Sequence, residues 1–423
     1  MPHRYFTNPY LKINLRKNEV AFVEEQMKAK ILALAEQCVD EFQQHKGNCR
    51  GPYVGLVGVA YALWYVATRP KMQSHQDHLL ALAKKIVDFH LECAEPDPRK
   101  DGAFLEGNAG VYVIAALLYH SLGDKAKSKS FVERVKSGAA SLYPLREENE
   151  HFDEVFNGRA GMLFGLLNLR IKADLGGDTE RLVGELVKAL LESGRKGAKE
   201  LGAGKEEGGG RKEHPPLVYS YHQRHYLGAA HGTAAILQAL LSAHQHLDKK
   251  DEEDLRASIN YFLHIQLPSG NFPSSMERIG ERARDEEEEL WHWCHGAPGV
   301  LHLLLAAYRH FKDPKYLQAA VTGAEGIWLK GLLKKGPGIC HGIAGNAYAF
   351  LLLSQLLPQE EKYELRALAF ARFLETDRFK QEARTPDRRW SLFEGWAGTI
   401  CFYADLLDPA NAEFPLFPHN VFP

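Results

Sequence analysis

The chain has 423 residues, of which 45% are hydrophobic, so it is long enough to bury a large core. Its formal net charge is −2, which excludes the strongly basic surface that nucleic-acid-binding proteins use. The six cysteines are scattered along the chain, as is typical of proteins in a reducing compartment. The sequence has no recognisable signal peptide, myristoylation site or membrane-spanning run, so we expect a cytoplasmic protein without a transmembrane segment.

A short motif, Gly-x-x-Gly followed by an apolar run, recurs along the chain at intervals of roughly 45 to 75 residues. Six copies are complete, and their first glycines are Gly55, Gly107, Gly158, Gly296, Gly342 and Gly395. A degenerate copy at His231-Gly232-Thr233-Ala234-Ala235 has alanine in place of the second glycine. Numbered along the chain, the degenerate copy is the fourth of seven.

The segments between and after these motifs alternate between two kinds of predicted helix. Residues 78–91 have apolar side chains three and four positions apart, which predicts an amphipathic helix. The runs at 111–118, 300–307, 347–353 and 399–407 are apolar nearly all round, which predicts helices buried on every side. Asp313-Pro314 is a typical helix start. Seven such pairs predict seven outer helices around seven inner ones, in a single domain that spans residues 1–423.

The two longest intervals between copies contain insertions. Residues 194–216 are rich in glycine, lysine and glutamate, so we expect a flexible surface loop there. The second insertion includes the charged run at 281–289.

Glycine at the start of a buried helix lets its first turn approach neighbouring chain closely. Helix N-termini also present free N–H groups and the positive end of the helix dipole, so seven of them around one centre would favour an anion. The alternative is that these glycines only allow the helices to pack.

Two of the seven copies carry Cys-His directly before the first glycine. They are Cys294-His295-Gly296 and Cys340-His341-Gly342. Thiolates and an imidazole at matching points of two repeats predict a zinc site with two cysteines and one histidine, and its fourth position would stay open as in catalytic zinc sites. The spacing does not decide whether His295 or His341 binds the metal. A pair of buried free cysteines beside a core histidine is the alternative.

His231 occupies the matching position of the fourth copy, which has no cysteine. A histidine there that is not needed as a ligand is a candidate general acid or base, although a structural role in the core is the alternative. Three acidic residues, Glu106, Glu154 and Glu394, precede the second, third and seventh copies by one, four and one residues. They could orient a histidine, pair with Arg159 or cap helices.

Together these motifs resemble those of the lanthionine synthetase C-like (LanC-like) family, especially its eukaryotic members. The resemblance runs nearly from end to end, and it is carried by the glycine motifs and by Asn8-Pro9-Tyr10, Gly228–Gly232, Trp293–Gly299, Gly331–Gly342, Ser391–Gly395 and Phe414–Phe417. It implies an all-α fold, the (α/α)7 toroid, with one zinc ion at the centre of one face.

The resemblance also implies an activity: zinc-dependent addition of the glutathione thiol to electrophiles, such as dehydroalanine or dehydrobutyrine residues in damaged proteins. The zinc ligands would be Cys294, Cys340 and His341, the acid that protonates the enolate would be His231, and the glutathione contacts would be Arg4, Lys335 and Arg384. The acidic partner, an aspartate in bacterial relatives, is Glu154 here. The alternative function is a catalytically weak scaffold that binds zinc, glutathione and a signalling protein.

Overall fold

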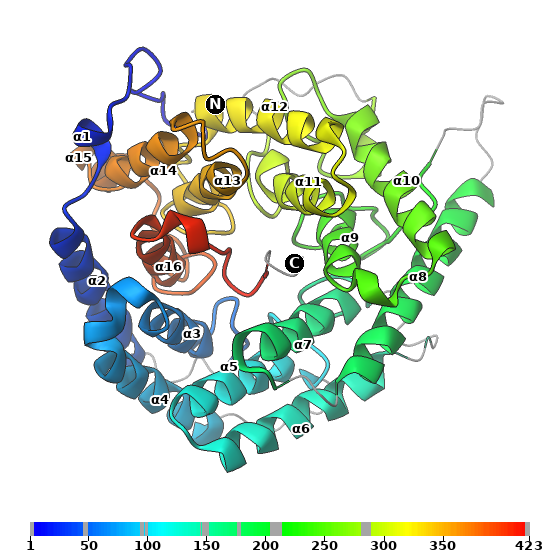
Figure 1. The fold of residues 1–423 in the computed structure, drawn as a ribbon, viewed down its shortest axis with the longest axis horizontal. Coiled ribbons are helices and arrows are strands. Elements are labelled where there is room, and N and C mark those ends of the chain that lie inside the picture. Colours follow the sequence, from blue (N-terminus) through cyan, green and yellow to red (C-terminus); the bar gives the residue numbers. More distant parts are fainter. Residues whose placement is uncertain are drawn as a thin grey trace.

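Two concentric rings of helices build the molecule (Figure 1). The computed structural model describes residues 4–44, 50–93, 97, 100–143, 145, 152–175, 179–203, 214–280 and 289–418. The inner ring consists of α3 (Leu56–Ala67), α5 (Asn108–Ser121), α7 (Arg159–Ala173), α9 (Thr233–Ser242), α11 (Ala297–Phe311), α13 (Ile343–Leu356) and α16 (Trp396–Leu406). The outer ring consists of α2 (Glu24–Gln44), α4 (Gln76–Cys93), α6 (Lys125–Leu142), α8 (Glu180–Ala203), α10 (Lys249–Ile265), α12 (Pro314–Lys330) and α14 (Lys362–Phe373). Within the described residues the predicted toroid of seven outer and seven inner helices is confirmed, with the short α1 (Lys17–Val20) and α15 (Asp377–Glu382) as additions.

The hydrophobic pattern explains which helix goes to which ring. Every residue of α3 is buried, as an inner helix surrounded by other helices requires. The outer helix α4 buries Leu79 and Ile86 and exposes Lys84 and Lys85, as its amphipathic pattern predicts. The predicted start of α12 is also confirmed, because the Asp313 side chain accepts a hydrogen bond from the Lys315 N–H group.

Each inner helix begins at a glycine motif, and the second glycine of the motif allows a close approach. In the six complete copies, a Cβ atom at this glycine would lie between 1.9 and 2.2 Å from the carbonyl oxygen of the residue six positions earlier. The glycines in question are Gly58, Gly110, Gly161, Gly299, Gly345 and Gly398. No side chain can be accommodated at such distances, so glycine lets the preceding loop fold back onto its own helix. The fourth copy has Ala235 at this point, so the Ala229 carbonyl must lie further away, although Thr233 and Ala234 donate to carbonyls seven residues back as Arg159 and Ala160 of the third copy do.

The seven loops that precede the inner helices are joined by backbone hydrogen bonds. We call the residues two positions before the first glycines the central ring: Tyr53, Leu105, Phe156, Ala230, Cys294, Cys340 and Phe393. Their N–H groups donate to the next copy's carbonyl in the pairs Tyr53–Leu105 (2.9 Å), Leu105–Phe156 (3.0 Å), Ala230–Cys294 (3.4 Å), Cys294–Cys340 (3.3 Å), Cys340–Phe393 (2.8 Å) and Phe393–Tyr53 (3.2 Å). The last pair joins the seventh copy to the first. All seven inner helices therefore start at the same end of the toroid.

The central ring is interrupted between its third and fourth members. The Phe156 N–H group donates instead to the Glu154 side chain, at 2.7 Å. The interruption lies between the third copy and the fourth, in which Ala235 replaces the second glycine.

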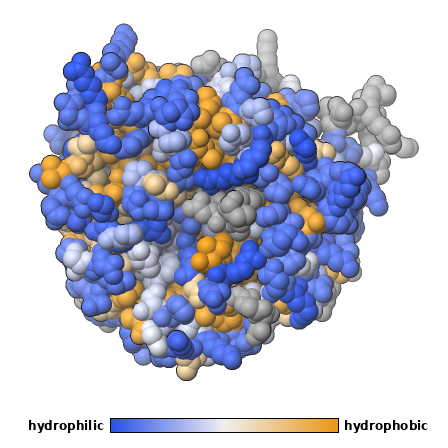
Figure 2. Space-filling model, in the orientation of Figure 1, coloured by the Kyte–Doolittle hydropathy of each residue, from blue (hydrophilic) through white to orange (hydrophobic). Residues whose placement is uncertain are grey.

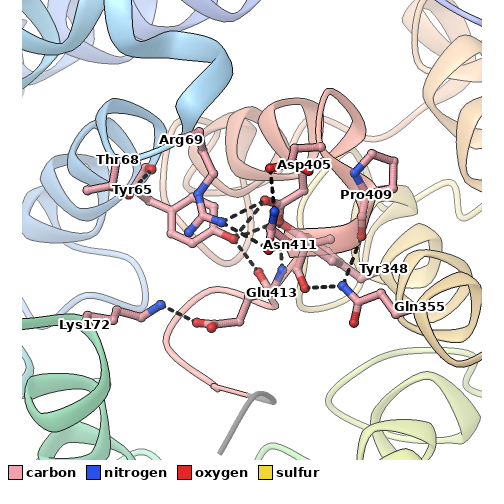
Figure 3. A network of polar contacts seen from close by, with 12 residues as sticks. Tyr65, Thr68, Arg69, Lys172, Tyr348, Gln355, Asp405, Pro409, Asn411 and Glu413 are labelled. Atoms are coloured by element: carbon pink, nitrogen blue, oxygen red, sulfur yellow. Dashed lines mark hydrogen bonds and ion pairs between the residues drawn. The ribbon is translucent and has the colours of Figure 1, made fainter.

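The opposite end of the toroid contains a buried polar network (Figure 3). Asp405, at the end of α16, accepts hydrogen bonds from the hydroxyl groups of Tyr65 on α3 and Tyr348 on α13, both at 2.9 Å. The Arg69 guanidinium group lies 3.8 Å from the same carboxylate, and the Glu413 N–H group donates to it at 3.3 Å. This network connects the first, sixth and seventh inner helices to the C-terminal segment.

The C-terminal segment enters the middle of the inner ring (Figure 1), and residues 412–418 are buried. Leu416 has φ 68, a left-handed conformation that is uncommon for a leucine. Two hydrogen bonds hold it there: its N–H group donates to the Tyr61 hydroxyl at 3.0 Å, and its carbonyl accepts from Asn168 at 2.9 Å. The segment therefore forms part of the core rather than a loose tail.

The expected loop over 194–216 is wrong in its first part, because α8 continues to Ala203. Arg195 lies within this part and pairs with Asp251 (2.7 Å) and Asp254 (2.9 Å) on the neighbouring α10. These ion pairs, and the helix-forming lysine, alanine and glutamate residues that follow, favour the helix despite its glycines. Residues 204–213 and the charged run at 281–288 lie outside the described residues.

The face seen in Figure 2 is mainly hydrophilic, and its apolar side chains are dispersed in small groups. Among the helices of the described residues, none combines the length and the hydrophobicity that crossing a bilayer requires.

The buried polar network around Asp405 makes the stability of the protein depend on pH. Burial raises the pKa of this carboxyl to about 7, although Arg69 and the hydrogen bonds from Tyr65 and Tyr348 oppose the shift. In the unfolded chain the pKa is about 3.9, so folding takes up a proton between these values and the group's contribution to stability falls as the pH rises from about 4 to 7. For Asp405→Asn we expect the free energy of unfolding, measured with urea, to gain about 2 kcal/mol relative to wild type between pH 5 and pH 8.

The matched control for this experiment is Asp377→Asn, because the Asp377 side chain is 89% exposed. Its stability should follow the wild-type profile at every pH. Parallel profiles for Asp405→Asn and wild type would show that Asp405 does not titrate in this range.

Candidate metal centre

Three side chains from two neighbouring loops meet at the end of the toroid where the inner helices begin. Cys294 comes from the loop before α11, whereas Cys340 and His341 come from the loop before α13. One donor atom from each of the three lies within 4.8 Å of the other two. Both cysteines are buried and His341 is half-buried. A tetrahedral zinc site needs donor atoms roughly 3.5 Å apart, so small side-chain movements would complete it.

Adjacent residues can both contribute because they lie in a turn and not inside a helix. Cys340 and His341 precede Gly342, which is the N-cap of α13 and has extended backbone angles. Of the two histidines that the spacing leaves open, the structure brings His341 into the group. Burial, with a smaller contribution from the His231 charge, lowers the pKa of His295 to about 4.

The chemistry of the donor set fits a zinc ion. Two sulfurs and one imidazole are soft and borderline ligands, which favour zinc over magnesium or calcium. Burial and the neighbouring Cys294 raise the pKa of the Cys340 thiol well above its usual value. A cation at this point would reverse that effect by stabilising the thiolate form.

His231 follows Ala230, whose N–H group donates to the Cys294 carbonyl at 3.4 Å, and its ring is held by a carboxylate. Its Nδ1 atom is 3.1 Å from Oε2 of Glu154, so the change from aspartate to glutamate still leaves the acidic group in contact with the histidine. The ring also stacks on Tyr221, with 4.6 Å between centroids and 1° between planes, and packs against Phe156 at 4.5 Å. Because Nδ1 faces Glu154, Nε2 is the atom that remains for proton transfer to a substrate.

Glu154 also spans the interruption in the central ring. It is 2% exposed, and its carboxylate accepts hydrogen bonds from the N–H groups of Phe156 and Asn157, each at 2.7 Å. Of the roles that the sequence leaves open for the acidic residues, Glu154 therefore both orients a histidine and satisfies backbone donors. Arg159 pairs instead with the buried Asp153, at 2.8 Å.

The three basic residues expected to contact glutathione lie on adjoining backbone segments. The Lys334 N–H group donates to the Arg4 carbonyl at 2.9 Å, and the Arg384 N–H group donates to the Lys334 carbonyl at 2.7 Å. Arg4, Lys335 and Arg384 are exposed. Burial lowers the pKa of His292 well below its usual value, and the positive charges of Lys335 and Arg4 contribute to the shift. The basic residues Arg4 and Lys335 are therefore within electrostatic reach of His292, two residues from Cys294.

Several residues of this centre carry no signal in the sequence that identifies them. Tyr53 donates a hydrogen bond to the Cys340 sulfur at 3.1 Å. Trp293 packs under the centre against Phe414 (5.3 Å between centroids) and Phe417 (5.2 Å). Aligning the seven copies on their glycines would have placed Tyr53 level with Cys294 and Cys340, but it would not have shown that their side chains meet.

A sequence model of the family described as lanthionine synthetase C-like protein matches residues 51–418. The chain belongs to the LanC-like family. A member from Danio rerio, named glutathione S-transferase LANCL1, is 36% identical over 315 residues, which cover 74% of this chain and 73% of the relative. The LanC-like protein GCL1 of Arabidopsis thaliana is 33% identical over 374 residues, which cover 86% and 80%. Among solved structures, nisin cyclase shares the fold with a TM-score of 0.66 at 15% identity, over 93% of this chain and 98% of that one.

The double role of Glu154 predicts that its loss destabilises the fold. In Glu154→Ala the N–H groups of Phe156 and Asn157 lose their acceptor, and an unsatisfied buried donor costs about 1–3 kcal/mol. We expect the free energy of unfolding, measured with urea, to fall by about this amount. Glu106→Ala is the matched control, because Glu106 is an exposed acid beside the second copy and should change stability by less than about 0.5 kcal/mol. Equal stability of Glu154→Ala and Glu106→Ala would show that the fold does not depend on Glu154 as the acceptor of these two N–H groups.

Proposed function

We propose that this LanC-like protein is a zinc-dependent, glutathione transferase-like enzyme. It adds the thiol of glutathione to electrophiles, namely dehydroalanine or dehydrobutyrine residues in damaged proteins. The observation that carries the proposal is the buried group of two cysteines and one histidine, with a carboxylate-held histidine beside it. The relative named glutathione S-transferase LANCL1 supports the choice of thiol substrate.

The three donors would hold the zinc and leave one tetrahedral position for the substrate thiol. A zinc ion in this site supplies one thing: it keeps the bound thiol deprotonated at neutral pH. Glutathione carries two carboxylates. The exposed cations Arg4, Lys335 and Arg384 are the groups that would bind them, because their backbone segments adjoin one another and Arg4 and Lys335 lie within electrostatic reach of His292.

The addition itself needs no oxidant or reductant. The sulfur of glutathione forms a bond to Cβ of the dehydroamino acid, the Cα=Cβ double bond becomes single, and the adjoining carbonyl takes up the negative charge. His231 then donates a proton from Nε2 to Cα, while Glu154 holds Nδ1. The proton released from the thiol balances the proton that His231 delivers.

The decisive measurement is mass spectrometry of a dehydroalanine-containing peptide after incubation with glutathione and the protein. The wild type should add one glutathione per dehydroalanine, and a chelator should abolish the product. Cys340→Ala should lose both zinc and activity, whereas His231→Ala should keep its zinc and lose about 10²–10⁴ of the rate. The matched control is Cys401→Ala, which removes another buried cysteine, on α16, and should keep zinc and activity. Full zinc content and full activity in Cys340→Ala would refute the proposed site.

The basic residues give a second, independent prediction. Lys335→Ala should raise the KM for glutathione by about tenfold, as the loss of one charged hydrogen bond implies, and it should leave the zinc content unchanged. Lys334→Ala is the matched control, since the Lys334 ammonium group lies 4.0 Å from the Glu382 carboxylate. Glutathione binding by calorimetry without any thioether product would favour the catalytically weak scaffold over the enzyme.

A further inference from the structure

Tyr53 is a member of the central ring that contacts the metal centre from outside the cysteine-bearing copies. It belongs to the first copy, which carries no cysteine, histidine or acidic residue in its motif. Its hydroxyl nevertheless donates a hydrogen bond to the Cys340 sulfur, at 3.1 Å. The first copy therefore contributes a contact to the site through a residue that the glycine motif does not include.

The position of the Tyr53 hydroxyl is fixed by both its backbone and its ring. The N–H group donates to the Leu105 carbonyl at 2.9 Å, and the carbonyl accepts from the Phe393 N–H group at 3.2 Å. The ring stacks on Phe393 with 5.0 Å between centroids, and it packs against Phe156 at 4.8 Å. The hydrogen bond to sulfur is therefore preformed, and maintaining it costs little additional side-chain entropy.

The same backbone bonds position the acceptor relative to the donor. The Cys340 N–H group donates to the Phe393 carbonyl at 2.8 Å, so Phe393 is bonded on one side to Tyr53 and on the other to Cys340. A displacement of the first copy would therefore move the hydroxyl and the sulfur together.

We propose that Tyr53 is a positioning residue of the metal centre, whose hydroxyl hydrogen bond to the Cys340 sulfur sets the affinity of the site for zinc. This inference rests on the proposed function, because it assumes that Cys340 is a ligand. The hydrogen bond orients the sulfur and withdraws part of its negative charge. It thereby offsets the excess charge that two cysteine thiolates and a substrate thiolate would accumulate at one ion.

The test is Tyr53→Phe, which removes the hydroxyl and retains the ring that contacts Phe156 and Phe393. Zinc affinity is measured by competition with a chromophoric chelator, and we expect it to fall by about tenfold, as for other groups that support a metal ligand. In the cobalt-substituted protein the sulfur-to-cobalt charge-transfer band should move to longer wavelength, because a sulfur that has lost its hydrogen bond is easier to oxidise. Neither readout depends on catalysis.

Two further variants make the outcome decisive. Tyr316→Phe is the matched control: it removes another buried hydroxyl, whose hydrogen bond goes to Asn260 at 2.8 Å, and it should change neither affinity nor spectrum. Tyr53→3-fluorotyrosine strengthens the donor, so its band should move to shorter wavelength, independently of how Tyr53→Phe folds.

A Tyr53→Phe protein with wild-type affinity and an unmoved band would overturn the inference. So would an equal loss in Tyr316→Phe, because the effect would then not be specific to the centre. Wild-type protein that binds no zinc and shows no sulfur-to-cobalt band would instead refute the proposed function itself.

Discussion

The arrangement of the site depends on the backbone hydrogen bonds that join the seven pre-helix loops. A glycine motif by itself places one loop against the start of one helix. The bonds of the central ring place the loops against each other, so that residues from distant parts of the sequence face a common centre. Cys294 and Cys340 meet because the N–H group of one donates to the carbonyl of the other, and the Phe393–Tyr53 bond joins the end of the chain to its beginning.

The one interruption of this ring coincides with the candidate acid. In the fourth copy Ala235 replaces the glycine that elsewhere lets the loop fold back, and the neighbouring Phe156 N–H group turns to Glu154. The carboxylate that satisfies this donor also binds Nδ1 of His231. A pair of side chains, Glu154 of the third copy and His231 of the fourth, therefore lies where the central ring lacks a backbone bond.

The repeated pattern allowed the fold and the donor set of the metal centre to be predicted from the sequence. The glycine motifs gave the number of helix pairs, and the matching positions of Cys294 and Cys340 gave the donor set, because equivalent residues of a closed repeat lie around one axis. The spacing alone could not decide between His295 and His341, since both follow a cysteine, whereas the family resemblance pointed to His341, the residue that the structure brings into the group. The hydroxyl contact of Tyr53 could not be foreseen, because it depends on side-chain length and on closure of the ring. The helix over residues 194–203 could not be predicted from composition, because its glycines disfavour a helix. The ion pairs that stabilise it join it to a helix that comes later in the chain.

The distribution of the donors over the repeats has a consequence for the order in which the molecule is made. Cys294, Cys340 and His341 belong to the fifth and sixth copies, whereas Tyr53 and Phe393 belong to the first and seventh. On the ribosome, all three donors are synthesised before the seventh copy that closes the toroid. Under the proposed function, an ion bound by these donors would hold the fifth and sixth repeats in register before the seventh docks. Cofactor loading would then be an early step of biogenesis and not its completion.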